Sequence, residues 1–142
     1  MGFFDFSADV ERAVHEAQDD PSRWSAKTAV HRAKFPAAVT RAGFRLLSRG
    51  GSFVPGTHEL VIGVAPWSDP DLEALEELVV HGRSGNVRIS VFDIDDLSFV
   101  EMFSLFPGIR GFFRTPVVLQ YRHGEPTYFG EGQDAVLWLR QF

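Results

Sequence analysis

The chain has 142 residues, of which 44% are hydrophobic and 23% charged, and it contains no cysteine. This length predicts one domain with a substantial core, and the apolar content excludes intrinsic disorder. The lack of cysteine excludes disulfides, thiolate metal sites, iron–sulfur clusters and thiol redox chemistry within the chain. No apolar stretch is as long as the about 18 residues that a membrane-spanning helix needs. Because the N-terminus also lacks a secretory signal, we expect a cytoplasmic location and no transmembrane segment.

The charges are unevenly distributed along the chain. The net charge is −5, yet residues 22–58 hold seven bases and no acid. Such segregation indicates an acidic partner, an anionic membrane or nucleic acid, or docking of the basic stretch on the chain's own acidic part. The sequence leaves these alternatives open.

The first third of the chain has helical periodicity. Apolar spacing predicts a helix over 8–18, and Asp20-Pro21 is typical of a second helix start. We expect Pro36 to restart or kink this helix, and Gly50-Gly51 to end it. The predicted helix over 34–49 is amphipathic, with a basic stripe formed by Lys34, Arg41, Arg45 and Arg49.

The remaining chain alternates between strand and helix patterns. Strands are predicted at 60–65, 87–92, 115–122 and 127–130, and helices at 70–81, 97–106 and 133–142. The order β-α-β-α-β-β-α indicates an α/β fold with a mixed sheet flanked by helices. We therefore divide the chain into a helical N-terminal extension, 1–58, and a single α/β domain, 59–142.

Several motifs in 59–142 have the order and spacing of the motifs of one known family. Residues 65–71, APWSDPD, resemble the redox loop A-x-W-C-G-P-C, and 92–95, FDID, resemble a strand-ending x-N/D-x-D. Thr115-Pro116 stands where the family has its cis-proline, and 121–125, YRHGE, resembles the family's hairpin turn. These motifs resemble those of the thioredoxin family, and the resemblance implies a thioredoxin-like fold with a cis bond before Pro116.

The departures from the family pattern concern its chemistry. Ser68 and Asp71 replace the two cysteines, and neither side chain supports thiol–disulfide exchange. The family also buries an aspartate paired with a lysine, and the matching positions here are Ile62 and Val91. Because a buried charge without a role is costly, we expect these two to form an apolar pair. The sequence therefore predicts a redox-inactive protein that is not a thiol–disulfide enzyme and uses no cofactor.

Two other chemistries are weaker alternatives. Ser68 resembles the hydroxyl of glutathione transferases, but SDPD at 68–71 is more typical of a helix start, with a capping side chain, proline and carboxylates at the positive end of the helix dipole. The five histidines are scattered, so no metal site is predicted.

In thioredoxins the redox loop and the cis-proline turn hold an extended peptide. The resemblance implies a matching face here, and we add two phenylalanines from the segment before the proline as interface candidates: the predicted binding residues are Trp67, Ser68, Asp69, Phe112, Phe113, Thr115 and Pro116. The expected function is a protein-binding module, such as an adaptor, assembly factor or chaperone-like protein, whose partner is another protein or peptide. The alternative is a peripheral module that binds an anionic membrane or nucleic acid through the basic helix 34–49. The sequence leaves the partner's identity and any homo-oligomer open.

Overall fold

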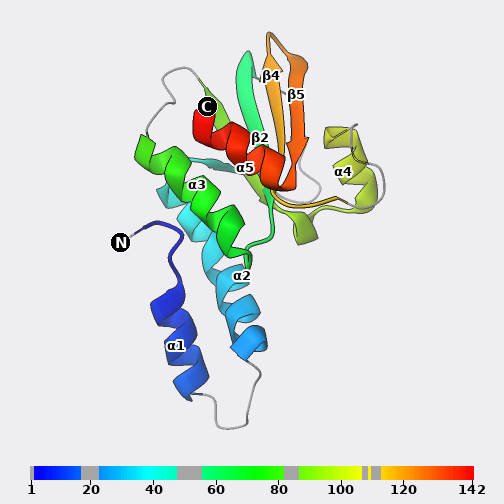
Figure 1. The fold of residues 1–142 in the computed structure, drawn as a ribbon. Coiled ribbons are helices and arrows are strands. Elements are labelled where there is room, and N and C mark those ends of the chain that lie inside the picture. Colours follow the sequence, from blue (N-terminus) through cyan, green and yellow to red (C-terminus); the bar gives the residue numbers. More distant parts are fainter. Residues whose placement is uncertain (1, 17–22, 48–55, 82–86, 107–108, 110–112) are drawn as a thin grey trace.

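The structure is a computed structural model that describes residues 2–16, 23–47, 56–81, 87–106, 109 and 113–142. Helices and strands alternate through most of this length (Figure 1). In chain order the elements are α1 (Ser7–Glu16), α2 (Arg23–Arg41), β1 (Arg45–Leu46), β2 (His58–Val64), α3 (Asp69–His81), β3 (Arg88–Asp93), a 3₁₀ turn η1 (Ile94–Asp96), α4 (Phe99–Leu105), β4 (Val117–Arg122), β5 (Glu125–Glu131) and α5 (Gly132–Gln141).

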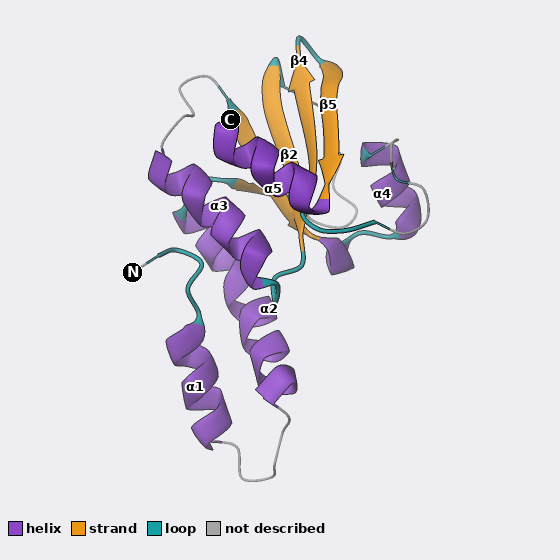
Figure 2. Ribbon diagram, viewed as in Figure 1, coloured by secondary structure: helices purple, strands orange, loops and turns teal. Residues whose placement is uncertain are grey.

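Five strands form one mixed sheet in the order β1-β3-β2-β4-β5, and Figure 2 shows β2, β4 and β5 side by side in it. β1, β3 and β2 are parallel, whereas β4 runs antiparallel to β2 and β5 antiparallel to β4. The predicted hairpin is present, and His123 and Gly124 both have positive φ, as a tight two-residue turn requires. The peptide bond between Thr115 and Pro116 is cis. This sheet order and this cis bond confirm the predicted thioredoxin-like fold.

The two faces of the sheet bury separate apolar clusters. The larger cluster contains side chains of α2, α3 and α5, and the smaller one contains side chains of α4. β2 is buried on both faces, with Leu60 and Ile62 in the first cluster and Val61 in the second. This explains why the strand has a continuous apolar run instead of an alternating pattern.

The prediction of one basic helix over 34–49 is wrong. α2 continues through Pro36 and ends at Arg41. Gly43 has a φ of 84°, and the N–H groups of Gly43 and Phe44 donate to the carbonyls of Thr40 and Val39 at 3.0 and 3.1 Å. This pattern is a Schellman helix end, which the prediction overlooked in favour of Gly50-Gly51. Pro36 is exposed, so its ring lies on the solvent side of the helix.

The stripe of four bases is consequently divided among different elements. Lys34 and Arg41 are exposed on α2, Arg45 is half-buried in β1, and Arg49 lies outside the described residues. β1 pairs with β3 in the register Arg45 to Ser90 and Leu46 to Val91. The first strand of the sheet is thus provided by residues that precede position 58.

The N-terminal segment has two parts. One part packs in the core, and the other projects beyond the sheet. Phe35, Ala38 and Val39 of α2 belong to the larger cluster, as do Phe4 and Phe6 from the segment before α1. α1 and the N-terminal half of α2 extend side by side beyond the end of the sheet (Figure 1). This arrangement confirms a helical N-terminal extension before β1, while the domain boundary at residue 58 stays a prediction.

Candidate functional site

The loop between β2 and α3 forms the first part of the candidate site. The N–H of Ser68 donates to the carbonyl of Ala65 at 2.9 Å, and the carbonyl of Ser68 accepts from the N–H of Leu72 at 3.1 Å. Ser68 therefore directly precedes α3, in the position expected from the sequence. Trp67 and Ser68 are half-buried, and Asp69 is exposed.

Asp71, in the first turn of α3, is a buried acid. Only 1% of the residue is exposed, and its Oδ2 accepts from the N–H of Ala65 at 2.9 Å. Oδ1 is also buried and has no hydrogen-bond partner of good geometry among the described residues. Burial raises the pKa of the Asp71 carboxyl, although the hydroxyls of Thr115 and Ser68 and the N–H of Ala65 act in the opposite direction.

The cis-proline turn forms the second part of the site. The N–H of Gly132 donates to the carbonyls of Arg114 at 3.1 Å and Pro116 at 2.9 Å, which fixes the turn against the start of α5. Gly132 has a φ of 62°, and a Cβ there would lie 3.0 Å from Cβ of Arg114. Glycine is therefore the residue that suits this position. Thr115 is half-buried beside the turn, and Pro116 is buried.

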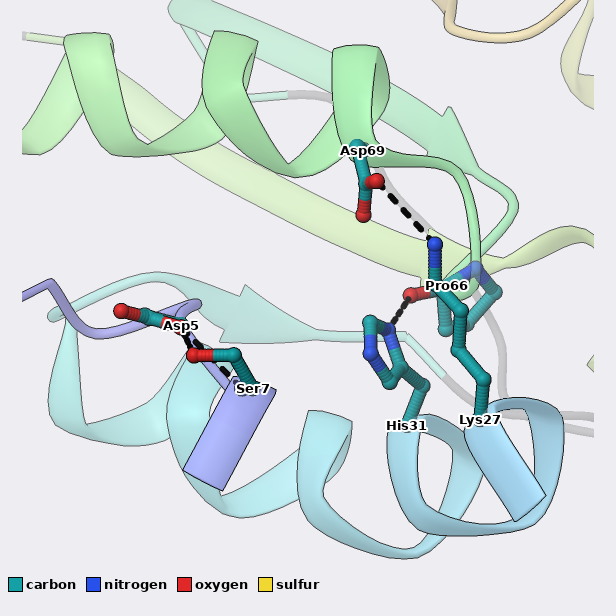
Figure 3. A network of polar contacts seen from close by, with 6 residues as sticks. All are labelled: Asp5, Ser7, Lys27, His31, Pro66 and Asp69. Atoms are coloured by element: carbon teal, nitrogen blue, oxygen red, sulfur yellow. Dashed lines mark hydrogen bonds and ion pairs between the residues drawn. The ribbon is translucent and has the colours of Figure 1, made fainter. Parts of the chain in front are cut away.

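Helix α2 contacts the loop from the side of the N-terminal extension (Figure 3). His31 is 4% exposed, and its Nδ1 lies 2.6 Å from the carbonyl oxygen of Pro66. Because a carbonyl only accepts, Nδ1 carries the proton in this bond. One turn earlier, Nζ of Lys27 lies 3.1 Å from Oδ2 of Asp69. These two contacts connect α2 to both ends of the loop.

Arg32 adds a third contact between α2 and the site. Its guanidinium lies 5.6 Å from the ring centroid of Trp67, and its Nη2 lies 2.8 Å from Oδ2 of Asp95. Asp95 in turn follows Asp93, whose Oδ1 accepts from the N–H of Asp95 at 2.8 Å and begins η1. Burial raises the pKa of the Asp93 carboxyl. The strand-ending motif noted in the sequence is therefore linked to Trp67 through Arg32.

The structure brings together four of the predicted binding residues and separates others. The hydroxyls of Ser68 and Thr115 both counteract the effect of burial on the pKa of Asp71, so the loop and the cis-proline turn lie next to each other at this residue, with Trp67 and Pro116 as their chain neighbours. Asp69 lies at the rim, in its ion pair with Lys27. Phe113 packs partly buried against the smaller cluster, and Phe112 lies outside the described residues.

Three residues near the site were missed by sequence reasoning. Asp71 was interpreted as a carboxylate near the helix dipole, and its burial was not expected. Its occurrence where the family has the second cysteine was the available signal. His31 and Arg32 were not singled out, although His31 shares the inward face of α2 with Phe35 and Ala38.

Other kinds of site find no support within the part of the chain that the structure describes. There, no three side chains of histidine, aspartate or glutamate are grouped to hold a metal ion. None of the described helices is both long and apolar enough to span a membrane.

Comparisons with known proteins return structures only. No family profile and no curated protein matches the chain. A mutant thioredoxin from Halobacterium salinarum is 18% identical, with a TM-score of 0.47 over 68% of this chain and 86% of that one. A thioredoxin from Malassezia sympodialis is 18% identical, with a TM-score of 0.48 over 68% and 90%. The J-Trx1 fragment of ERdj5 is 11% identical, with a TM-score of 0.48 over 98% and 85%. By its sheet order, its cis-proline and its composition, the chain is a cysteine-less protein of thioredoxin-like fold.

Proposed function

We propose that this protein is a redox-inactive, thioredoxin-like binding module that holds an extended polypeptide segment on one face. We call this surface the Trp67/Pro116 face, and it consists of Trp67, Ser68, Thr115 and Pro116. The observation that carries the proposal is the backbone of Thr115. This residue precedes the cis bond outside β4, and neither its N–H nor its carbonyl bonds another backbone group in the described residues.

An extended segment is the natural ligand for such a position. Its own N–H and carbonyl groups alternate along the chain, so it pairs with a backbone edge as an added strand does. The half-buried Trp67 ring provides apolar surface beside this edge, and the hydroxyls of Ser68 and Thr115 provide further hydrogen bonds. The face therefore combines backbone recognition with a small apolar contact.

The missing thiols determine the kind of binding. A thioredoxin-type loop with cysteines forms a mixed disulfide with its substrate, whereas Ser68 and Asp71 form no such bond. Capture on this face is reversible and noncovalent, which suits an adaptor, an assembly factor or a chaperone-like protein whose partner is another protein.

The test is a pull-down from lysate of the source cell with four forms of the protein. Trp67→Ala and Thr115→Arg change the face, and Val80→Arg changes a residue of α3 that is 71% exposed. We expect polypeptide partners to be retained by the wild type and Val80→Arg, and lost by both face variants, at low and at high salt. Circular dichroism and melting temperature verify that each variant is folded.

Salt dependence separates the proposal from electrostatic binding. Binding through exposed bases falls steeply as salt increases, because screening and counterion effects weaken it. Partners that the face variants still retain, or nucleic acid and lipid that high salt removes, would overturn the proposal. The basic helix that suggested such ligands is not present as one element.

A further inference from the structure

A pocket lies where the N-terminal segment, helix α2 and the start of α3 meet. Its volume is about 220 Å³. Figure 3 shows five of the residues that line it: Asp5, Ser7, Lys27, His31 and Asp69. The four residues of the Trp67/Pro116 face are not among its lining residues, so the pocket is separate from that face.

One nitrogen of the buried His31 ring is available to a ligand in this pocket. Nδ1 donates its proton to the carbonyl of Pro66 at 2.6 Å, so Nε2 of the neutral ring is an acceptor. Nε2 has no hydrogen-bond partner among the described residues and is not fully enclosed, although His31 as a whole is only 4% exposed. In Figure 3 this nitrogen is on the side of the ring that faces Asp5 and Ser7. A nearly buried acceptor of this kind is stabilised by an N–H group of a ligand.

Asp5 contributes a carboxylate to the same pocket. Its Oδ1 accepts from the N–H of Ser7 at 3.1 Å and from the hydroxyl of Ser7 at 2.6 Å. The bond from the hydroxyl, followed by the bond from the N–H, lowers the pKa of Asp5, so the group is ionised at neutral pH. Oδ2 has no hydrogen-bond partner among the described residues. The carboxylate is thus held in place by one oxygen and keeps the other for a ligand.

A second hollow beside the pocket adds further negative charge. Its volume is about 250 Å³, and it shares Phe4, Asp5 and Asp69 with the pocket. Glu73 and Glu76 of α3 complete its charged lining, and no base lines it in the part of the chain that the structure describes. Carboxylates concentrated in this way attract a positively charged ligand.

The two bases that line the pocket do not neutralise it. Lys27 pairs with Asp69 at 3.1 Å, and Arg23 pairs with Glu11 of α1. Across the pocket and the adjoining hollow, five carboxylates are lined up with only these two bases. The carboxylate of Asp5 and Nε2 of His31 therefore remain as acceptors in a negatively charged surrounding.

We propose that this pocket binds the guanidinium group of an arginine side chain carried by a partner polypeptide. A guanidinium has five N–H donors and no acceptor, so it supplies a donor for Nε2 of His31 and another for Oδ2 of Asp5. It is also planar and more weakly hydrated than an ammonium, which suits a pocket lined in part by the rings of Phe4 and Phe6. The inference goes beyond the proposed function, because the pocket and the Trp67/Pro116 face have no residue in common.

The test uses a tripeptide probe and its neutral analogue on the intact chain. The probe is an arginine between two glycines, with both termini blocked, and the analogue has citrulline, an uncharged urea of the same shape, in place of arginine. Each is titrated into ¹⁵N-labelled protein at about pH 8, where an ordinary imidazole is neutral. Shifts of the Ser7 and Lys27 backbone amides and of Nε2 of His31 report binding. We expect saturable binding of the arginine probe, and binding of the citrulline analogue that is weaker several-fold.

Two variants remove one acceptor each. His31→Asn keeps an amide donor near the position of Nδ1, for the carbonyl of Pro66, but has no atom at the position of Nε2. Asp5→Asn keeps an oxygen for Ser7 and removes the charge. We expect each variant to weaken binding of the arginine probe several-fold. Glu77→Gln is the matched control, because Glu77 pairs with Arg140 and does not line the pocket.

Three results overturn the inference. They are an arginine probe that shifts none of the three reporters, a citrulline analogue that binds as tightly as the probe, and a probe whose affinity neither variant reduces. If His31→Asn fails to fold, Asp5→Asn, a change at an exposed residue, decides the last of these. The pull-down with Trp67→Ala and Thr115→Arg tests the proposed function separately, since those residues lie outside the pocket.

Discussion

Ile62 of β2 and Val91 of β3 are direct partners across the parallel strands, and neither exposes any surface. Both belong to the larger apolar cluster. They occupy the positions where the thioredoxin family, by the resemblance in sequence, buries an aspartate and a lysine. The expected apolar pair is thus confirmed: without thiols to serve, these positions stabilise the core by burial alone.

A charge at this pair should be strongly destabilising. Ile62→Asp places an unpaired carboxylate among apolar side chains, and we expect a loss of about 3–5 kcal/mol in the free energy of unfolding. Adding Val91→Lys should recover part of this loss, because the two positions are in register. Denaturant unfolding of both single variants and the double variant measures their coupling. The register would be contradicted if the double variant lost as much free energy of unfolding as the two single variants lose together.

Asp71 should make the protein less stable as pH rises. Its folded-state pKa is raised, so its contribution is fully present below the unfolded-state value and is lost as pH rises through the folded-state value. Asp71→Asn should remove this decline. The measurement is the free energy of unfolding from about pH 3 to pH 8, with Glu73→Gln as the matched control. A decline of the same size in Asp71→Asn would show that another group causes it.

Glu59 should make the protein more stable as pH rises, which is the opposite of the effect expected for Asp71. It is fully buried, and burial alone would raise its pKa. Hydrogen bonds from Arg88 at 2.6 Å, Ser90 at 2.6 Å and the N–H of Gly56 at 2.7 Å outweigh burial, and they lower the pKa. The stability from this carboxylate is present above the unfolded-state pKa and is lost as pH falls through the folded-state value.

Glu59→Gln should therefore cost stability near neutral pH and little at low pH, where the wild-type acid is protonated too. The same unfolding series, analysed for this variant, checks the prediction. A loss that is equal at both ends of the pH range would indicate that packing, not charge, is what the substitution changes.

The contacts of α2 with the loop should differ in strength. His31 is buried, so His31→Ala leaves the carbonyl of Pro66 without its donor and should cost about 2 kcal/mol. Arg32 is 54% exposed in its side chain, so Arg32→Ala should cost less than about 1 kcal/mol despite its contacts with Asp95 and Trp67. Thermal unfolding of both variants tests this order. A larger loss of stability in Arg32→Ala than in His31→Ala would contradict it.

Local signals in the sequence were sufficient to predict the strands and helices from β2 onward. The apolar run of β2, the helical period of α3 and the His123-Gly124 turn each depend on neighbours along the chain. The end of α2 was missed because glycines at 43 and at 50–51 are equally good stops on local grounds. Pairing of Arg45 and Leu46 with β3, a long-range contact, selects the first.

The residues of the candidate site also divide into those that a local motif marks and those that depend on long-range packing. Trp67, Ser68, Thr115 and Pro116 were found because a motif in the chain marks each segment. Burial of Asp71 is a result of tertiary packing, and the contact of His31 with Pro66 joins residues that are 35 positions apart. No period or motif in a single sequence encodes such a contact.

Site-specific photo-crosslinking tests the central claim, capture of an extended segment on the Trp67/Pro116 face, most directly. A photoreactive phenylalanine replaces Asp69, which is exposed at the rim of the face, or Val80, which is exposed at the far end of α3. The account predicts that the probe at 69 crosslinks to a polypeptide at one short extended segment, and that Thr115→Arg abolishes the product. Equal crosslinking from position 80, or a product that persists in Thr115→Arg, would contradict the account.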